Sequence, residues 1–267
     1  MEVKHTFVVL AYKESKYLER CIQSVKKQEF ASEVVIATST PNEFIKSLAE
    51  KYNIEVIVNP EPGKGIGYDF DFAVNTVVND IVTIAHQDDI YDYAFSSEVV
   101  RAYQRDPKAI IIFSDYYEIR NRKKIKTNTN LRIKRFLLIP LCIPGVRKMS
   151  RTKRFIIAFG NSICCPAVSF VKSNINRKDI FASHMKCNVD WLGWERLSRE
   201  KGNFIYINKR LMGHRIHEES TTTDIIKDNI RTVEDREMFS KFWPQWLVKI
   251  LNRLYIKSEK SNRIKGE

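Results

Sequence analysis

The feature that most constrains the fold is the alternation of short apolar runs with amphipathic segments over the first 118 residues. Leu18, Ile22 and Val25, for example, recur at helical spacing between two such runs. Continuous apolar strands that alternate with helices predict a mostly parallel sheet, covered by helices on both faces. The chain is therefore expected to be an α/β protein, with strands at 6–11, 33–37, 54–58, 80–85 and 109–117.

Two adjacent carboxylates, Asp88 and Asp89, follow one of these strands. In α/β sheets the ligand binds beyond the carboxyl ends of the strands. Neighbouring carboxylates repel each other, and a bound Mg²⁺ or Mn²⁺ or simple exposure in an Asp-rich turn would offset that cost. Both interpretations remain open at this point. Other polar residues expected near this edge of the sheet are Tyr12, Glu14, Thr38, Ser39, Thr40, His86 and Gln87.

The glycine-rich segment 63–67, which contains Lys64, is a weaker signal. It lacks the full spacing of a dinucleotide-binding fingerprint, and it does not end in the Lys-Ser or Lys-Thr pair of a phosphate-binding loop. A plain turn is the favoured interpretation, and a flexible turn near a phosphate is the alternative.

The less regular second half contains a helix that is predicted to begin near Asp190 and to end at Gly202. Asp190 could cap this helix, or it could act as a general base that faces a cleft. Arg215 and His217 occupy alternate positions of a predicted extended segment and so share one face. They could bind a diphosphate, or the segment could be a solvated strand.

Basic residues are concentrated between Ile119 and Lys178, where 16 Lys and Arg occur without any Asp or Glu. The rest of the chain has 29 basic and 32 acidic residues, so this block accounts for the whole net charge of +13. Basic residues interleaved with apolar ones suit an anionic lipid surface, and a solvated basic loop is the alternative. Nucleic acid would accept the charge, but no nucleic-acid-binding motif accompanies it. The residues of this block expected to face lipid include Arg132, Lys134 and Arg135.

The location of the protein is predicted from what its sequence lacks. The chain begins without a signal-peptide pattern, and no apolar run of about 18 residues predicts a transmembrane helix. Five cysteines without metal-ligand spacing indicate reduced thiols. A cytoplasmic protein with a membrane-facing basic segment is expected.

The predicted domain organisation is one domain at 1–223, with halves at 1–118 and 119–223, and a helical extension at 224–267. Within the extension, residues 243–265 form an amphipathic pattern with a basic polar face. This helix could dock on the domain or lie on a membrane.

Taken together, these segments resemble the family-2 glycosyltransferases, which have the GT-A fold, a Rossmann-like sheet flanked by helices. The resemblance covers most of the chain in the right order. It rests on the opening strand and helix, the glycine-containing turn, the strand that leads to the paired carboxylates, and the closing Arg-x-His strand. The segments that match are 7–28, 59–92, 159–171 and 190–222.

The resemblance implies roles for individual residues. The family's metal motif falls on His86, Gln87 and Asp88, so that Asp88 would contact Mg²⁺ or Mn²⁺ with support from Asp89, while His86 replaces the first carboxylate. Asp190 matches the catalytic base. Thr38-Ser39-Thr40 stands where the family has an Asp-Asp-Gly-Ser turn that binds the base and ribose. The other nucleotide-contacting positions are Ala11, Tyr12, Glu14, Lys64, Arg215 and His217.

The implied activity is inverting transfer of a sugar from a nucleotide-diphosphate sugar, with UDP-sugar favoured, to a hydroxyl of a glycan or lipid-linked acceptor. Many relatives act in bacterial surface-polysaccharide synthesis at the inner face of the cell membrane, so the resemblance implies a cytoplasmic protein that is peripheral on that face. A nucleotidyltransferase, or a catalytically silent relative that binds a membrane or a partner, is the alternative. A nucleic-acid-binding protein is least favoured.

Overall fold

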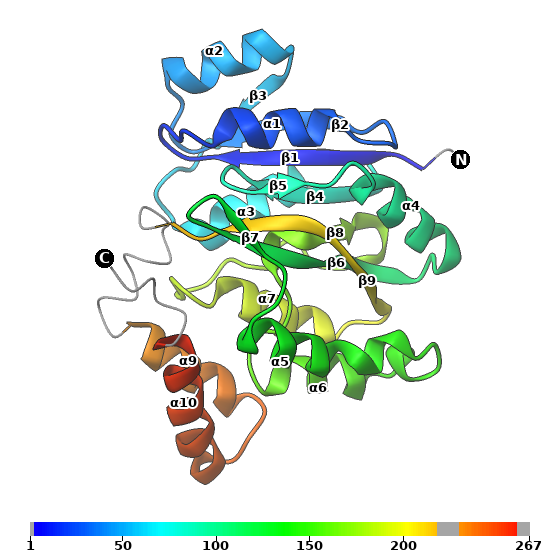
Figure 1. The fold of residues 1–267 in the computed structure, drawn as a ribbon, viewed down its shortest axis with the longest axis vertical. Coiled ribbons are helices and arrows are strands. Elements are labelled where there is room, and N and C mark those ends of the chain that lie inside the picture. Colours follow the sequence, from blue (N-terminus) through cyan, green and yellow to red (C-terminus); the bar gives the residue numbers. More distant parts are fainter. Residues whose placement is uncertain (1–2, 218–229, 261–267) are drawn as a thin grey trace.

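The structure is a computed structural model that describes residues 3–217 and 230–260. This part of the chain forms a nine-stranded mixed sheet in the order β3-β2-β1-β4-β8-β6-β9-β5, with β7 paired to β6 (Figure 1). The strands are β1 His5–Ala11, β2 Glu33–Thr38, β3 Glu55–Val58, β4 Ile81–His86, β5 Ile90–Tyr91, β6 Ala109–Arg120, β7 Lys123–Ile125, β8 Val168–Val171 and β9 Asn203–Arg215.

The predicted mostly parallel sheet is confirmed, with antiparallel additions. Strands β3, β2, β1 and β4 run parallel to one another, and so do β6 and β9. Strand β8 lies antiparallel between β4 and β6, while β5 and β7 pair antiparallel with β9 and β6. The sequence pattern did not reveal these three strands as antiparallel, because their direction depends on partners that are far away in the chain.

Helices cover both faces of the sheet, as predicted. They are α1 Leu18–Lys26, α2 Glu43–Tyr52, α3 Ile66–Asn75, α4 Phe95–Arg105, α5 Thr129–Leu138, α6 Ser150–Ala158, α7 Val189–Ser198, α9 Ile230–Ser240 and α10 Gln245–Lys260. Short 3₁₀ turns are η1 Ile139–Cys142, η2 Val146–Lys148, η3 Cys165–Ala167 and η4 Lys172–Asn174. Alternate residues of β1 face opposite cores, since Val8 belongs to one buried cluster and Val9 to the other.

Helix α3 begins at Ile66, inside the glycine-rich segment 63–67. Gly65, with a φ of 115°, allows the turn that precedes the helix. Gly67 lies in the first turn, where a Cβ atom would be 2.5 Å from the backbone oxygen of Phe181. The glycines of this segment therefore begin a helix and permit a close approach between two parts of the chain.

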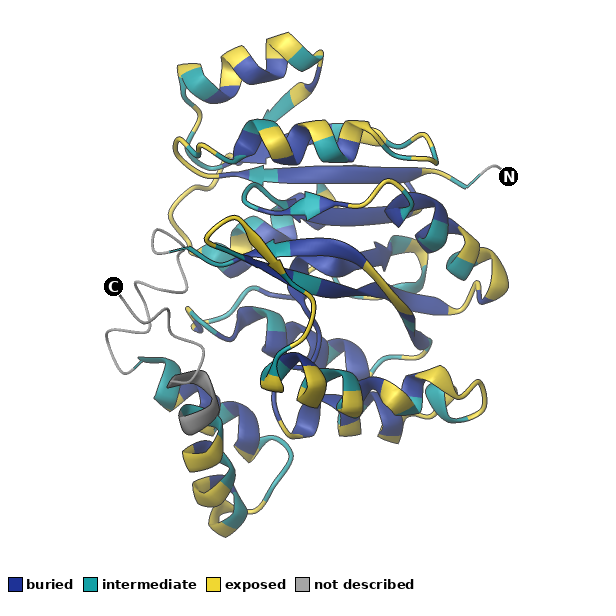
Figure 2. Cartoon of the chain, viewed as in Figure 1, coloured by how far each residue is buried: buried dark blue, intermediate teal, exposed yellow. Residues whose placement is uncertain are grey.

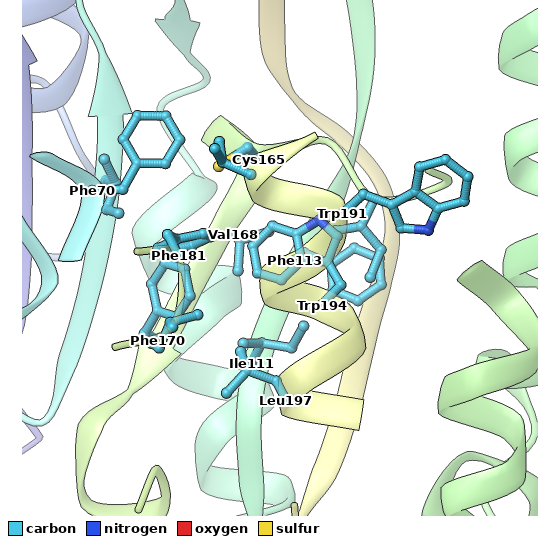
Figure 3. Close-up of a cluster of buried hydrophobic side chains, with 14 of the residues drawn as sticks. Phe70, Ile111, Phe113, Cys165, Val168, Phe170, Phe181, Trp191, Trp194 and Leu197 are labelled. Atoms are coloured by element: carbon cyan, nitrogen blue, oxygen red, sulfur yellow. The ribbon is translucent and has the colours of Figure 1, made fainter. Parts of the chain in front are cut away.

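Helix α7, which contains Asp190, is held by a buried aromatic cluster (Figure 3). The Trp194 ring lies 5.6 Å from Phe181 and 6.0 Å from Phe170, measured between centroids. The indole nitrogen of Trp191 donates a hydrogen bond to the Ile157 carbonyl at 2.9 Å. Both tryptophans are fully buried, and such large buried side chains contribute strongly to core stability. The position of Asp190 is thus set by packing.

The C-terminal helices dock on the domain beside α7. The Glu234 carboxylate of α9 accepts hydrogen bonds from three successive backbone amides, those of Lys186, Cys187 and Asn188. The Trp191 ring contacts Phe239 of α9 and Tyr255 of α10. Of the two alternatives for the amphipathic tail, docking is therefore observed. The predicted domain boundary at 223 and 224 lies outside the described residues.

None of the helices in the described ranges is both long enough and apolar enough to cross a bilayer.

Gly67→Ala is expected to cost about 1–3 kcal/mol by overpacking, because contact with a backbone oxygen cannot be relieved by a side-chain rotation. Replacing Gly in a helix gains about 1 kcal/mol of propensity, so the free energy of unfolding is expected to fall by up to about 2 kcal/mol. Gly145→Ala is the matched control, since a Cβ there meets nothing within 4 Å and its φ is −70°. Urea denaturation measures both variants, and equal stabilities would contradict the packing account.

Candidate active site

A cavity of about 510 Å³ among the described residues brings together residues that are far apart in the sequence. Asp88 follows β4, Asp190 lies in the first turn of α7, and Arg215 ends β9, and all three line this cavity. His86 and Asp89 line it as well. His217 is not among the lining residues, but its ring contacts Asp88.

A hydroxyl, an imidazole and a guanidinium surround Asp88. Its Oδ1 accepts a hydrogen bond from Ser15 Oγ at 2.9 Å, and its Oδ2 lies 3.2 Å from Nε2 of His217. Arg215 Nε donates to the backbone oxygen of Asp88 at 2.9 Å, and its guanidinium lies 4.3 Å from the centroid of the Tyr17 ring. The predicted pair Arg215 and His217 is therefore next to the predicted metal-contacting carboxylate.

Asp89 connects the β4 end to the last strand. Its buried carboxylate accepts a hydrogen bond from the Arg215 amide at 2.8 Å and lies 3.2 Å from Nδ1 of His214. Burial lowers the pKa of His214, but the neighbouring Asp89 carboxylate raises it by more, so the net change is upward. The Asp89 side chain therefore points toward β9. Asp89 supports Asp88 by fixing the position of the turn after β4.

The donor set suits a divalent cation that takes most of its ligands from substrate. No cluster of three or more His, Cys, Asp or Glu side chains that could enclose a metal occurs within residues 3–217 and 230–260. The carboxylate of Asp88 is partly exposed and supplies oxygen, the ligand atom that Mg²⁺ and Mn²⁺ prefer. Mg²⁺ in particular is commonly held by one or two carboxylates together with substrate phosphates. The residues present therefore fit such an ion.

Asp190 is held by two hydrogen bonds. Asn161 Nδ2 donates to its Oδ2 at 2.6 Å, and the Trp191 amide donates to its Oδ1 at 2.8 Å. Asn188 occupies the cap position of α7, so the N-cap interpretation of Asp190 is wrong. Burial raises the pKa of the Asp190 carboxyl above its ordinary value, although both hydrogen bonds act in the opposite direction. Asn161 was not singled out in the sequence, because it lies 29 residues away in an irregular segment.

His86 contributes an imidazole to the cavity. Its ring lies 5.1 Å from the Phe70 ring, and its Nε2 is buried without a hydrogen-bond partner among the described residues. Burial lowers the pKa of His86, which favours the neutral ring.

The ends of β1, β2 and β4 meet beside the cavity. Ala11 pairs with Thr38 and Leu10 with His86 in the parallel register. The amide of the Gln87 side chain donates to the Tyr12 carbonyl and accepts from the Tyr12 amide, each at 3.0 Å. The predicted nucleotide-contacting residues that do not line the cavity itself are Ala11, Tyr12, Glu14, Thr38, Ser39, Lys64, Gln87 and His217. Lys64 is exposed and forms an ion pair with Glu61.

Asp69 is a polar residue at this edge that the sequence interpretation missed. Its carboxylate accepts hydrogen bonds from the Ser39 hydroxyl and from Asn59 Nδ2. The Thr38 hydroxyl instead faces inward and accepts from the Thr40 amide. Asp69 lies on α3, 30 residues after Ser39 in the chain, so nothing in the sequence pattern connected the two residues.

Two residues of the basic block point inward. Lys134 lines the cavity, with Nζ 3.2 Å from the Tyr116 hydroxyl. Arg135 forms an ion pair with Asp115 at 2.9 Å and donates to the Tyr116 carbonyl. The expectation that Lys134 and Arg135 face lipid is therefore wrong, because their partners lie on β6, about twenty residues earlier in the chain. Arg132 is exposed.

The sequence profile described as glycosyl transferase family 2 matches residues 6–178, which is more than half of the chain. No curated protein matches the sequence. Among solved structures, the chain is similar to TarS from S. aureus, with a TM-score of 0.62 at 14% identity over 93% of this chain. It spans only 42% of that TarS chain. The likeness to solved structures at this identity defines the fold, which is GT-A.

Two further structures have bound ligands. A shorter form of TarS, 1-349, in complex with UDP-GlcNAc has a TM-score of 0.64 at 14% identity, over 95% of this chain and 72% of that chain. The mannosyltransferase PcManGT from Pyrobaculum calidifontis, in complex with GDP-Man and Mn²⁺, has a TM-score of 0.57 at 12% identity, over 89% and 63%. The fold and the matching profile together define the class: this chain belongs to glycosyl transferase family 2.

Asn161→Ala is expected to raise the pKa of Asp190 further, because it removes a hydrogen bond that stabilises the charged carboxylate. NMR titration of the Asp190 side-chain carbon measures this. Asn130→Ala is the control, since Asn130 lines the same cavity and is not among the groups that shift the Asp190 pKa. A pKa that is unchanged or lower in Asn161→Ala would contradict the assigned role of Asn161.

Proposed function

We propose that the protein is a metal-dependent, inverting glycosyltransferase that moves a sugar from a nucleotide-diphosphate sugar to a hydroxyl of a glycan or lipid-linked acceptor. The observation that supports this most strongly is that Asp88, Asp190 and Arg215 line one cavity, although 127 residues separate Asp88 from Arg215. A cavity that contains both a carboxylate with a raised pKa and an arginine guanidinium suits a single in-line displacement.

Asp190 is the general base of the proposed reaction. It accepts the proton of the acceptor hydroxyl while that oxygen attacks the anomeric carbon from the face opposite the leaving diphosphate. A carboxyl whose pKa is raised by burial is a stronger base than an exposed one, and the Asn161 hydrogen bond orients it. One displacement inverts the anomeric carbon and requires no covalent enzyme intermediate.

Arg215 and His217 bind the leaving diphosphate in this proposal. Both lie beside Asp88, so the guanidinium of Arg215 and the imidazole of His217 are near the place where negative charge develops. Asp88, with Asp89 supporting its position, would hold Mg²⁺ or Mn²⁺. When bound, such an ion supplies Lewis-acid stabilisation of the diphosphate.

The strand ends at Ala11, Tyr12, Glu14, Thr38 and Ser39 would bind the nucleoside. Asp69 adds a carboxylate beside Ser39, which could accept a hydrogen bond from a ring N–H of uracil or guanine. The complexes of similar structures with UDP-GlcNAc and GDP-Man are compatible with either base, and UDP-sugar is the favoured donor. Lys64 and Gln87 complete the nucleotide-contacting set, Lys64 from the flexible turn and Gln87 through its bonds to Tyr12.

The proposed acceptor places the enzyme at a membrane. A glycan or lipid-linked acceptor for surface-polysaccharide synthesis would be found at the inner face of the cell membrane, where the cytoplasmic leaflet is anionic. The acid-free basic segment 119–178 supports a peripheral contact with such a surface.

A screen of nucleotide sugars for Mn²⁺- or Mg²⁺-dependent hydrolysis tests the proposal. One nucleotide sugar, expected to be a UDP-sugar, should release its nucleotide with the wild type. Asp88→Asn and Asp190→Asn should each lower the rate by about 10²–10⁴-fold, because one removes an ion-binding oxygen and the other the base.

Asp179→Asn is the matched control for this screen, since Asp179 is an exposed aspartate outside the cavity. It should leave the rate unchanged, and circular dichroism should show that all three variants are folded. Equal rates in wild type and Asp190→Asn, or no nucleotide release from any donor, would refute the proposed reaction.

The pH profile of kcat/KM should show an acid limb set by Asp190. The rate falls as pH falls through the pKa of this residue, because the protonated carboxyl cannot accept the hydroxyl proton. Since burial raises that pKa, the limb should lie above the ordinary aspartate value, and Asn161→Ala should move it to higher pH. An acid limb that does not move in this variant would show that another group is the base.

A further inference from the structure

Exposed apolar side chains gather at one end of the molecule. Of the 16 large apolar side chains that are exposed in the described ranges, ten lie either between residues 133 and 159 or on α10. In Figures 1 and 2, α5, α6 and α10 lie at the end of the molecule opposite α2, and exposed positions mark all three. The ten residues are Ile133, Phe136, Ile139, Ile143, Met149, Phe155, Phe159, Trp246, Ile250 and Leu254.

Helix α10 has two apolar sides. Its inner side packs on the domain through Val248, which is fully buried, and Tyr255. Its outer side exposes Trp246, Ile250 and Leu254, at 65%, 48% and 60%, one helical turn apart. Lys249 and Arg253 lie on the same outer side and are exposed. Docking of α10 on the domain therefore leaves a second stripe, of apolar and basic residues, uncovered.

Helices α5 and α6 present the same combination. Phe155 and Phe159 lie one turn apart and are exposed, with Arg151 one turn before them. On α5, Phe136 is 71% exposed and follows the exposed Arg132 by one turn. No acidic residue occurs between Ile119 and Lys178 to balance these charges.

The two stripes meet at the candidate active site. Ile133 of α5, Phe159 at the end of α6 and Leu254 of α10 are exposed and also line the cavity that contains Asp190. The rim of the cavity on this side is therefore apolar and continues into the exposed stripes.

We propose that this apolar–basic face, formed by the ten apolar residues above with Arg132, Lys148, Arg151, Lys249 and Arg253, lies on an anionic lipid bilayer. The cavity then opens toward the bilayer, and a lipid-linked acceptor reaches Asp190 directly from the membrane. This inference rests on the proposed function for the identity of the acceptor, while the membrane contact itself does not.

Charge distinguishes a bilayer from other partners of this face. The exposed charged residues named for the face are all basic, so two copies placed face to face would bring like charges together. An anionic bilayer accepts both the cations and the inserted apolar groups, and Trp is favoured at the membrane–water interface. Because Lys134 and Arg135 are directed inward, the contact depends on the exposed cations and not on the whole basic block.

Sedimentation with vesicles of phosphatidylcholine, with and without phosphatidylglycerol, tests the proposal. The wild type should bind the anionic vesicles, and added salt should weaken binding. Trp246→Ser with Ile250→Ser, and separately Lys249→Glu with Arg253→Glu, should each lower the partition coefficient about tenfold or more. None of these four residues lines the cavity.

The charge-matched control is Lys27→Glu with Lys46→Glu, which makes the same change in net charge on exposed lysines beside α1 and on α2. It should bind vesicles nearly as well as the wild type. A loss of vesicle binding in this control equal to that of the Lys249/Arg253 variant would show a nonspecific charge effect. Retained vesicle binding by the Trp246/Ile250 variant would show that the face is not inserted in the bilayer. A change in oligomeric state of that variant without loss of vesicle binding would assign the face to a second copy. Each of these results would overturn the proposal.

Donor hydrolysis in the absence of vesicles separates the two proposals. If the proposed membrane contact is correct and the proposed transferase activity is not, the variants bind vesicles as predicted above while no nucleotide is released. If the proposed transferase activity is correct and the proposed membrane contact is not, the α10 variants hydrolyse donor normally and bind vesicles as the wild type does. Circular dichroism establishes that each variant is folded.

Discussion

The buried carboxylate of Asp89 is the interaction on which the arrangement of the site depends. It accepts a hydrogen bond from the Arg215 amide and pairs with His214, and so joins the turn after β4 to the end of β9. Asp88 precedes it, Arg215 ends the other strand and His217 follows that strand, so this one contact places an anion beside two basic side chains. An unpaired buried carboxylate would be costly, and the folded chain therefore favours this alignment.

Packing supplies the second part of the site. Trp191 and Trp194 hold α7 against the sheet and the C-terminal helices, and Asp190 lies beside them in the first turn. The helix is almost wholly buried, so Asp190 cannot move far from the cavity. Its raised pKa and its hydrogen bond to Asn161 follow from that location. The same docking of α9 and α10 that buries Trp191 also leaves one side of α10 exposed near the cavity rim.

Periodicity and strand order were sufficient to predict the α/β sheet and the residues placed at its carboxyl edge, of which His86, Asp88 and Asp89 line the cavity. They were not sufficient where a side chain's partner is distant. The contacts of Asp69 with Ser39, of Asn161 with Asp190 and of Arg135 with Asp115 each join segments that no periodicity relates. Charge along the sequence likewise predicted a basic surface without showing that Lys134 and Arg135 are directed inward.

In the proposed reaction, the cavity between Asp88 and Asp190 binds the nucleotide-diphosphate sugar. A crystal structure with UDP and Mn²⁺ is the decisive experiment. We expect density for the diphosphate beside Arg215 and His217, a cation on Asp88, and open space between the terminal phosphate and Asp190 large enough for a sugar. A nucleotide bound elsewhere on the chain, or with its diphosphate remote from Asp88, would contradict it.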